Sequence, residues 1–350
     1  MSNERSMSPG DSTTVSTGSV VIRVEAPDSS GRSTGKRLLV AVLTASILMN
    51  VVFLLSKAAE SSSPASGISQ SHHSGNASAP SKLAVINFSG TIMPPYTERW
   101  LKQIKHATSD DNVKGVLLAI DSPGGLVADS HQLYHELKKL SDRKPVYVAM
   151  KRLAASGGYY IAMASGNSGR IFAEPTTWTG SIGVIVPRFN ASELATKIGV
   201  KVEPLVTGPL KDSLNPFRDL TEREQEVWKA ILDDSFVRFV GVIEQNRPKL
   251  NEEQVRALAT GQIYTANQAV ESGLVDEIGY EEDALAALAS SIGLTDYETI
   301  EYSATPGLID VLLGAKAQQS TSVMDQVLEA SVPRAMYYCS WNPWVSGSTR

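Results

Sequence analysis

The sequence predicts an α/β protein with a largely parallel sheet and an N-terminal transmembrane helix. Two observations predict this fold class. Apolar runs alternate with helical patterns between residues 82 and 300, and a long apolar stretch near the N-terminus carries no charge. Hydrophobic residues make up 42% of the chain, enough for an ordinary core, and the single cysteine, Cys339, excludes an internal disulfide.

The N-terminal stretch divides into a tail and an anchor. Residues 1–35 are rich in Ser, Thr, Gly and Pro without sustained periodicity, which predicts a disordered cytoplasmic tail. In the predicted anchor, residues 36–57, the run 38–56 lacks charge and is long enough to span a bilayer. Basic residues crowd its N-terminal side, which puts the N-terminus in the cytoplasm and the rest outside. The alternative, a cleaved signal peptide, is disfavoured because the stretch exceeds a typical apolar signal region.

Two further segments flank the predicted globular domain, residues 82–300. Residues 58–81 are rich in Ser, Ala and Gly, which predicts a flexible linker; we expect His72 and His73 there to be solvated rather than metal-bound. Residues 301–350 are a C-terminal extension of unknown role, ending in an aromatic but non-periodic stretch.

Within the domain, strands and helices alternate, as βαβ units do. Strands are predicted at 83–90, 113–121, 145–150, 170–175, 181–186 and 200–206. Helices are predicted at 96–109, 126–141, 157–166, 221–245, 251–259, 266–272 and 281–290. Thr221 with Glu224 three residues later is the pattern of a capping box at the start of the longest helix.

Charge and composition exclude some classes of function. A net charge of −5 and a pI near 5.7 provide no basic surface for a phosphate backbone, so we expect no nucleic-acid partner. No Cys/His cluster has the spacing of zinc ligands, so we expect neither metal nor cofactor.

A glycine pair marks the first candidate site. Gly124 and Gly125 follow a predicted strand, at the strand end where α/β proteins bind ligands. Adjacent glycines let the backbone approach a substrate and direct N–H groups at one point, as in an oxyanion hole. A purely structural turn is the alternative.

Ser156 is the candidate nucleophile. It follows a predicted strand and opens a helix, where N–H groups favour developing negative charge, and glycines after it leave room for a peptide. Its alternative role is a simple helix N-cap.

A serine nucleophile needs a base. All five histidines precede Ser156; His131 and His135 remain formal candidates, although we expect them to serve packing or the surface. A lysine can replace histidine if burial lowers its pKa from about 10.4 towards roughly 7–8. Lys211 lies in a Gly/Pro-containing segment that could deliver it into a cleft, provided that Asp212 points elsewhere; a solvated loop lysine is the alternative.

Together these motifs resemble the short form of bacterial signal peptide peptidase A and, more distantly, the ClpP/crotonase superfamily. The resemblance rests on DSPGG (121–125), ASGGYYIA (155–162), TGSIGVI (179–185), GPLKD (208–212) and YTANQAVESGLVDEIG (264–279).

The resemblance implies repeated ββα units and a Ser/Lys serine endopeptidase that degrades remnant signal peptides. Ser156 matches the nucleophile, Lys211 the general base, Gly124 and Gly125 the oxyanion donors, and Ser181 a serine that holds the lysine. It also implies a homo-oligomer in which neighbouring protomers supply the serine and the lysine. The expected location is the bacterial cytoplasmic membrane, with the catalytic domain on its outer side.

Three alternatives stay open: a crotonase-like acyl-CoA enzyme, a ClpP-like Ser/His peptidase, and a catalytically inactive membrane scaffold.

Overall fold

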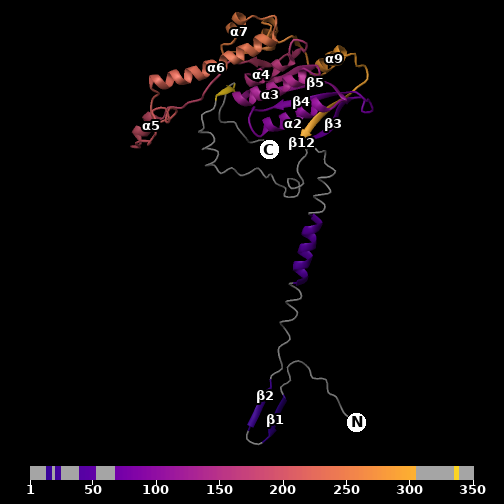
Figure 1. Ribbon diagram of the computed structural model, residues 1–350, viewed down its shortest axis with the longest axis vertical. Coiled ribbons are helices and arrows are strands. Elements are labelled where there is room, and N and C mark those ends of the chain that lie inside the picture. The colour runs from indigo at the N-terminus through magenta and orange to yellow at the C-terminus, as the bar shows by residue number, and fades with distance from the viewer. Residues whose placement is uncertain (1–12, 18–19, 25–38, 53–67, 305–334, 339–350) are drawn as a thin grey trace. The chain divides into compact units, whose positions relative to one another are not determined.

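The computed structural model describes residues 13–17, 20–24, 39–52, 68–304 and 335–338 (Figure 1). They belong to two compact units, Met1–Ser63 and Pro64–Arg350, each taken by itself below.

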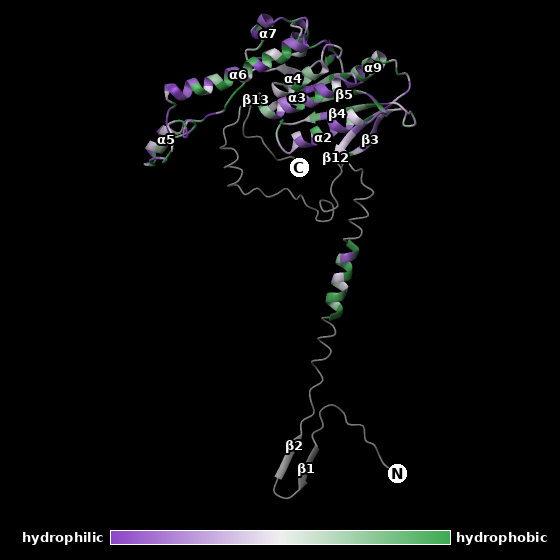
Figure 2. Cartoon of the chain, in the orientation of Figure 1, coloured by the Kyte–Doolittle hydropathy of each residue, from purple (hydrophilic) through white to green (hydrophobic). Residues whose placement is uncertain are grey.

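In the first unit, β1 (Thr13–Thr17) pairs antiparallel with β2 (Val20–Val24). Part of the tail predicted as disordered therefore forms an antiparallel pair of strands, whose many β-branched residues favour this structure. A helix covers residues 39–52, and its residues are mostly apolar (Figure 2). No helix in the described parts of the chain is both long and apolar enough to span a membrane. The two ends of the predicted anchor lie outside the described residues.

The second unit is built on a nine-stranded, mostly parallel sheet with the strand order β10-β9-β7-β5-β4-β12-β3, in which β8 and β11 branch from β7. Its strands are β3 (Ile68–Gly75), β4 (Lys82–Ser89), β5 (Val113–Ser122), β7 (Val146–Ala155), β8 (Ile171–Ala173), β9 (Trp178–Gly180), β10 (Ile263–Thr265), β11 (Glu277–Ile278) and β12 (Glu298–Ala304). Only the pairs β10–β9 and β12–β3 are antiparallel among these strands. The predicted α/β class with a largely parallel sheet is confirmed.

Helices cover both faces of the sheet, which explains why its central strands are almost continuously apolar. On one face, Ala84 and Ile86 of β4 pack in a core that includes α2 (Tyr96–Ser109) and α3 (Val127–Ser141). On the other, Leu83 and Val85 pack with α9 (Glu281–Ser291). The short α4 (Gly157–Ala162) and a 3₁₀ turn (Met163–Ser165) belong to the first core.

The longest helix, α6 (Glu222–Asn246), is anchored at one end only. Thr221 and Glu224 form the predicted capping box at its start. Its buried apolar side chains all lie in its second half, starting at Phe239. Short helices precede and follow it: α5 (Ser192–Lys197), α7 (Glu252–Leu258) and α8 (Ala266–Glu271).

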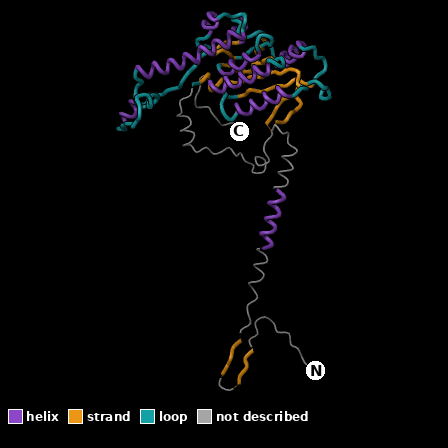
Figure 3. Tube along the Cα trace, viewed as in Figure 1, coloured by secondary structure: helices purple, strands orange, loops and turns teal. Residues whose placement is uncertain are grey.

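Three further segments differ from the predictions. The predicted linker contains β3, which covers the free edge of β12, a pairing that Ser-rich composition does not reveal. The predicted strand at 181–186 is replaced by β9 just before it, because Gly180 and Ser181 both take positive φ angles (82° and 48°) that end the strand. Residues 200–206 form neither strand nor helix (Figure 3), and their side chains are exposed to solvent.

Candidate active site

Ser156 lies on a strained turn between β7 and α4. Its backbone angles are φ 55° and ψ −115°, a conformation that costs residues with a β-carbon on the order of 1–3 kcal/mol. Two hydrogen bonds hold it: its N–H donates to Gly180 O (2.7 Å) and its C=O accepts from Tyr160 N–H (2.8 Å). Such strain persists where surrounding structure over-determines it, and it concentrates at functional positions.

The Ser156 hydroxyl is the unusual part of this turn. The residue is only 1% exposed, and its Oγ has no hydrogen-bond partner among the described residues. It makes no side-chain capping bond to α4, so the N-cap alternative does not account for it. Buried hydroxyls nearly always find a partner, and one without a partner requires a functional explanation.

The glycine pair lies beside this turn, in β6 (Gly124–Leu126). Gly124 has φ 94°, and a β-carbon there would lie 2.6 Å from the Gly157 nitrogen, so only glycine fits. The Gly124 N–H donates to Ser122 Oγ (3.1 Å) and is therefore already used. Gly124 thus lets its backbone lie close to that of Gly157. Because its N–H is already bonded, it is a poorer candidate than Gly125 for an oxyanion donor.

Gly125 and Gly157 are the better pair of donors. Along β6, Leu126 N–H donates to Ile92 O (2.9 Å), so the Gly125 N–H, one residue earlier, faces the opposite edge. A β-carbon on Gly157 would lie 3.2 Å from the Gly125 nitrogen, so the two backbones adjoin. From the sequence, Gly157 is expected only to leave room beside the Ser156 hydroxyl. Its place directly after Ser156 is the sequence feature that could have marked it as a candidate donor.

Ser181 directly follows β9, the strand paired with β7, which directly precedes Ser156. Ala155 of β7 lies opposite Gly180 of β9, so the two serines follow paired positions of parallel strands. Ser181 also has positive φ and is only 9% exposed. The sheet therefore places a second serine next to the turn at Ser156, and the contact of Ser181 with Lys211 stays a prediction.

Lys211 lies on a different part of the molecule, which we call the arm: residues 188–237, comprising α5, the extended segment 200–206, the turn with Lys211 and the first half of α6. Lys211 is exposed on a turn closed by its N–H and Gly208 O (3.1 Å). The arm exposes many large apolar side chains, among them Phe189, Leu194, Ile198, Leu205, Val206, Leu210, Phe217 and Ile231. Within one chain, the structure does not bring Lys211 to Ser156 Oγ.

The Asp212 carboxylate is held away from its neighbour. It accepts hydrogen bonds from Arg218 Nε (2.9 Å) and Asn215 Nδ2 (3.1 Å). Arg218 also forms an ion pair with Glu224 at 2.6 Å, which ties the turn to the start of α6. This meets the condition that Asp212 point elsewhere if Lys211 is to act as a base.

The Glu224 side chain is almost fully buried, at 1% exposure. Hydrogen bonds from Arg218, followed by the N–H and hydroxyl of Thr221, lower the pKa of Glu224 from 4.5 to about 2. The network of Arg218, Asp212 and Glu224 thus fixes the loop that presents Lys211.

The histidine alternative gains no support from the contacts. His131 Nδ1 lies 2.7 Å from the Tyr160 hydroxyl, and His135 is exposed. Burial first, and then Arg238 and His135, lower the pKa of His131. The His131 ring packs at the border of a cluster of aromatic side chains formed by Tyr134, Tyr160, Phe239 and Tyr337.

Tyr337 was missed by sequence reasoning. It lies in β13 (Met336–Tyr338), inside the extension of unknown role, and it is fully buried. β13 pairs with β6, so this segment lies directly beside the candidate site. The pairing of β13 with β6 shows that Tyr337 lies near the site, whereas the sequence around Tyr337 has no strand-like alternation that would predict a strand.

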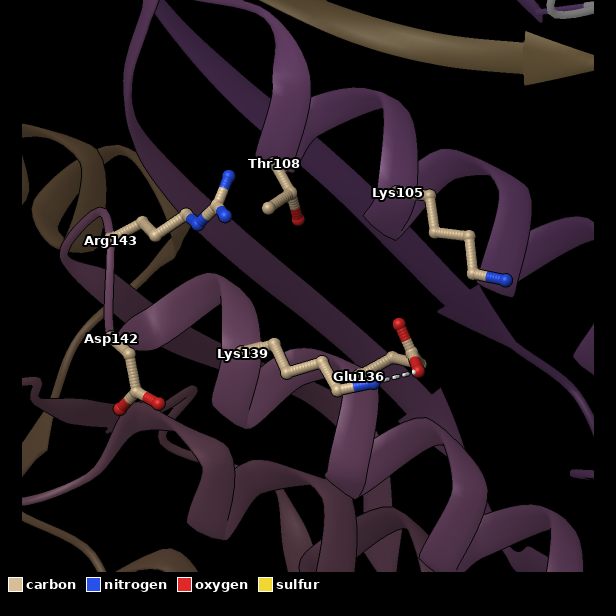
Figure 4. Close-up of a pocket in the computed structure, with 6 residues that line it drawn as sticks. All are labelled: Lys105, Thr108, Glu136, Lys139, Asp142 and Arg143. Atoms are coloured by element: carbon tan, nitrogen blue, oxygen red, sulfur yellow. Dashed lines mark hydrogen bonds and ion pairs between the residues drawn. The ribbon is translucent and has the colours of Figure 1, made fainter.

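A separate surface cavity of about 350 Å³ lies between α2 and α3 (Figure 4). Its lining residues are Lys105, Thr108, Glu136, Lys139, Asp142 and Arg143. Lys139 and Glu136, three residues apart on α3, form an ion pair at 2.7 Å on one wall of the cavity, and none of the predicted site residues lines it. Among the described residues, no group of three or more His, Cys, Asp or Glu side chains could hold a metal.

Comparison with known proteins shows which family the chain resembles. The model of Peptidase family S49 matches residues 138–295. A protein of Enterococcus faecium named as a signal peptide peptidase SppA is 40% identical over 254 residues, 69% of this chain and 73% of that protein. Protease 4 of Salmonella typhi is 31% identical over 232 residues, 66% of this chain and 37% of that protein.

Among solved structures, a ClpP1 mutant from Listeria monocytogenes is similar with a TM-score of 0.40 at 19% identity, covering 57% of this chain and 94% of its own. The family relationship rests on the sequence relatives alone, because one of them is matched over nearly three quarters of its length. This chain belongs to peptidase family S49 and is a serine-type peptidase.

Proposed function

We propose that this chain is a membrane-anchored endopeptidase in which Ser156 attacks the peptide bond and Lys211 of a neighbouring chain is the general base. The observation that carries the proposal is the separation of the two groups. Ser156 Oγ is buried without a partner among the described residues, while Lys211 is exposed on an arm covered with apolar side chains.

A second copy of the chain would provide a partner for the Ser156 hydroxyl and would cover the exposed apolar side chains of the arm. Apolar side chains exposed in this number on one element indicate an interaction surface. Docking the arm on a neighbouring copy would cover these side chains and remove Lys211 from water. Loss of water lowers the pKa of an amine, and only the neutral amine can act as a base. Ser181, next to Ser156, would then accept or donate a hydrogen bond that holds the amine in place.

The proposed reaction follows from these positions. Ser156 Oγ attacks the substrate carbonyl carbon as the Lys211 amine accepts the hydroxyl proton. The N–H groups of Gly125 and Gly157 stabilise the tetrahedral oxyanion, and Gly124 provides the space for it. Lys211 then donates the proton to the leaving amine, and water releases the acyl group from Ser156.

The substrates we propose are peptides confined to the membrane, chiefly signal peptides left after secretion, as the name of the Enterococcus relative suggests. The charge-free run at 38–56 supports a single-pass anchor in the bacterial cytoplasmic membrane. The basic residues before it support a cytoplasmic N-terminus and a catalytic domain on the outer side.

The decisive experiment mixes two inactive chains. We expect Ser156→Ala and Lys211→Ala to lack peptidase activity separately. Co-expressed in one cell and purified together in detergent, they should recover about a quarter of wild-type activity, because random assembly pairs an intact Ser156 with an intact neighbouring Lys211 at that frequency.

Co-assembled chains that stay inactive would contradict a dyad shared between chains. An active Lys211→Ala chain would show that another group is the base. The matched control is Lys201→Ala, which removes another exposed lysine of the same arm and should leave activity unchanged.

A further inference from the structure

The strand that carries Gly125, β6, is held on one side by main-chain hydrogen bonds to Ile92. The Ile92 N–H donates to Gly124 O (2.8 Å), and its C=O accepts from Leu126 N–H (2.9 Å). These bonds engage one backbone group on each side of Gly125. The other two flanking groups, the Gly124 N–H and the Leu126 C=O, are each bonded by a serine side chain.

Ser122 bonds the first of these groups. Its Oγ accepts from Gly124 N–H (3.1 Å) and donates to Gly90 O (2.6 Å), and the residue is fully buried. Its main chain also adjoins α4, since a β-carbon on Gly158 would lie 2.9 Å from Ser122 O. Ser122 therefore connects the start of β6 both with the residue that follows β4 and with the helix that Ser156 opens.

Ser130, in the first turn of α3, bonds the second group. Its Oγ donates to Leu126 O (2.9 Å), and this residue is also fully buried. A serine bond to the carbonyl four residues earlier is common in helices. What sets Ser130 apart is a contact: a β-carbon on Gly157 would lie 2.5 Å from Ser130 Oγ and 3.2 Å from Gly125 N. The Ser130 hydroxyl therefore joins the end of β6 to the backbone of Gly157.

We propose that Ser122 and Ser130 are positioning residues that set the spacing and direction of the Gly125 and Gly157 N–H groups. The proposal rests on the proposed function, in which these two N–H groups stabilise the oxyanion, and it adds two residues to that site. Both hydroxyls are bonded to the backbone, so they act through the glycines. Oxyanion donors act once charge has developed, and a displacement of about 1 Å can lower a rate about 10²-fold. The serines therefore govern the chemical step rather than the binding of the peptide.

The test compares kcat and KM for a quenched fluorogenic peptide of Leu and Ala, cleaved by full-length variants in detergent. Ser122→Ala leaves the Gly124 N–H unbonded, and Ser130→Ala removes the bond to Leu126. We expect each to lower kcat at least roughly tenfold while KM stays within about twofold, because the lost precision matters only in the transition state. Ser122→Thr and Ser130→Thr keep the hydroxyl and should bring kcat back to within about threefold of the wild type.

The matched control is Ser141→Ala, at the last residue of α3. Ser141 Oγ donates to Lys138 O (3.0 Å), so this variant removes the same kind of bond at the end of the helix away from Ser130. It should keep the wild-type kcat and KM. Thermal melts report whether each variant is folded, and either serine is sufficient for the test if substitution of the other prevents folding.

The outcomes separate this inference from the proposed function. Wild-type kcat in the folded alanine variants, or a fall in kcat that Ser141→Ala shares, would overturn the positioning role and leave Ser156 as the nucleophile. A higher KM at unchanged kcat, or folded threonine variants as slow as the alanine variants, would overturn it as well. Full activity of Ser156→Ala in the same assay would overturn the proposed function and this inference with it.

Discussion

The end of the sheet that carries Ser156 and the arm that carries Lys211 are built in opposite ways. Around Ser156, residues from β5, β6, β7 and β9 are buried and joined by main-chain hydrogen bonds. Around Lys211, the chain has little regular structure and exposes its apolar side chains to water. Figure 1 shows α5 at the end of α6 that lies away from α7.

This difference indicates how the side chains of the proposed nucleophile and the proposed base are held in position. A strained nucleophile turn needs a rigid surrounding, and the parallel strands supply it within one chain. If Lys211 is the base, as we propose, its exposed loop cannot position it within one chain, and the proposed assembly would have to do so. The Arg218 network orients the loop, but it does not bury Lys211.

The largest expected effect comes from removing the groups themselves. Ser156→Ala and Lys211→Ala should each lower kcat/KM for an apolar peptide by at least about 10³-fold, as loss of a nucleophile or its base does. The thermal melting temperature should change little, because Lys211 is exposed and Ser156 Oγ makes no hydrogen bond among the described residues. A Lys211→Ala chain with wild-type kcat/KM would remove the arm from the mechanism.

A charge on the arm should have the next largest effect. Leu205 is fully exposed in one chain, so Leu205→Glu costs the monomer little. If the arm docks on another copy, burying the carboxylate is unfavourable, and we expect dissociation with at least a tenfold loss of activity, measured by light scattering and peptide hydrolysis. Gln132→Glu, which adds the same charge at an exposed position of α3 outside the arm, is the control for charge alone. An unchanged molar mass for Leu205→Glu would contradict docking through this surface.

In the buried region around Ser156, two glycines with similar φ angles, Gly90 and Gly124, offer a matched pair of test positions. Gly124 (φ 94°) leaves no room for a β-carbon, whereas Gly90 (φ 98°) has nothing within 4 Å of that position. Gly90→Ala should lower the free energy of unfolding by about 1–2 kcal/mol, the cost of the angle alone. Gly124→Ala should cost about 1–3 kcal/mol more from crowding and should also lower kcat/KM. Chemical denaturation compares the two, and equal losses would mean that the backbone around Gly124 yields easily.

The smallest effect concerns acid. The folded pKa of Glu224 is about 2, below its ordinary 4.5, so its ionised form is the one that the fold stabilises. That stability is complete above about pH 4.5 and declines as the pH falls towards 2. Thermal melts over this range should fall less steeply for Glu224→Gln than for the wild type. Parallel slopes would show that the ion pair with Arg218 does not couple the arm to pH.

Much of the fold follows from local pattern. The apolar runs that became β4, β5 and β7 and the helical periods that became α2, α3 and α6 are readable because burial on two sheet faces or one helix face imposes a period. By contrast, β3 and β13 have no such pattern. They exist because another strand offers an unpaired edge, and that edge is formed by distant residues.

The candidate site divides in the same way. The sequence by itself determined which residue types could act, because Ser156, the glycine pair and Lys211 each stand in a motif whose chemistry is local. Tertiary structure decided which of them meet: it placed Gly157 and Ser181 beside Ser156, engaged the Gly124 N–H with Ser122, and left Lys211 exposed without a contact to Ser156 Oγ. It also brought Tyr337 beside Gly125. The physical reason is that hydrogen-bond pairing and burial join residues far apart in the chain, and no local pattern encodes the partner.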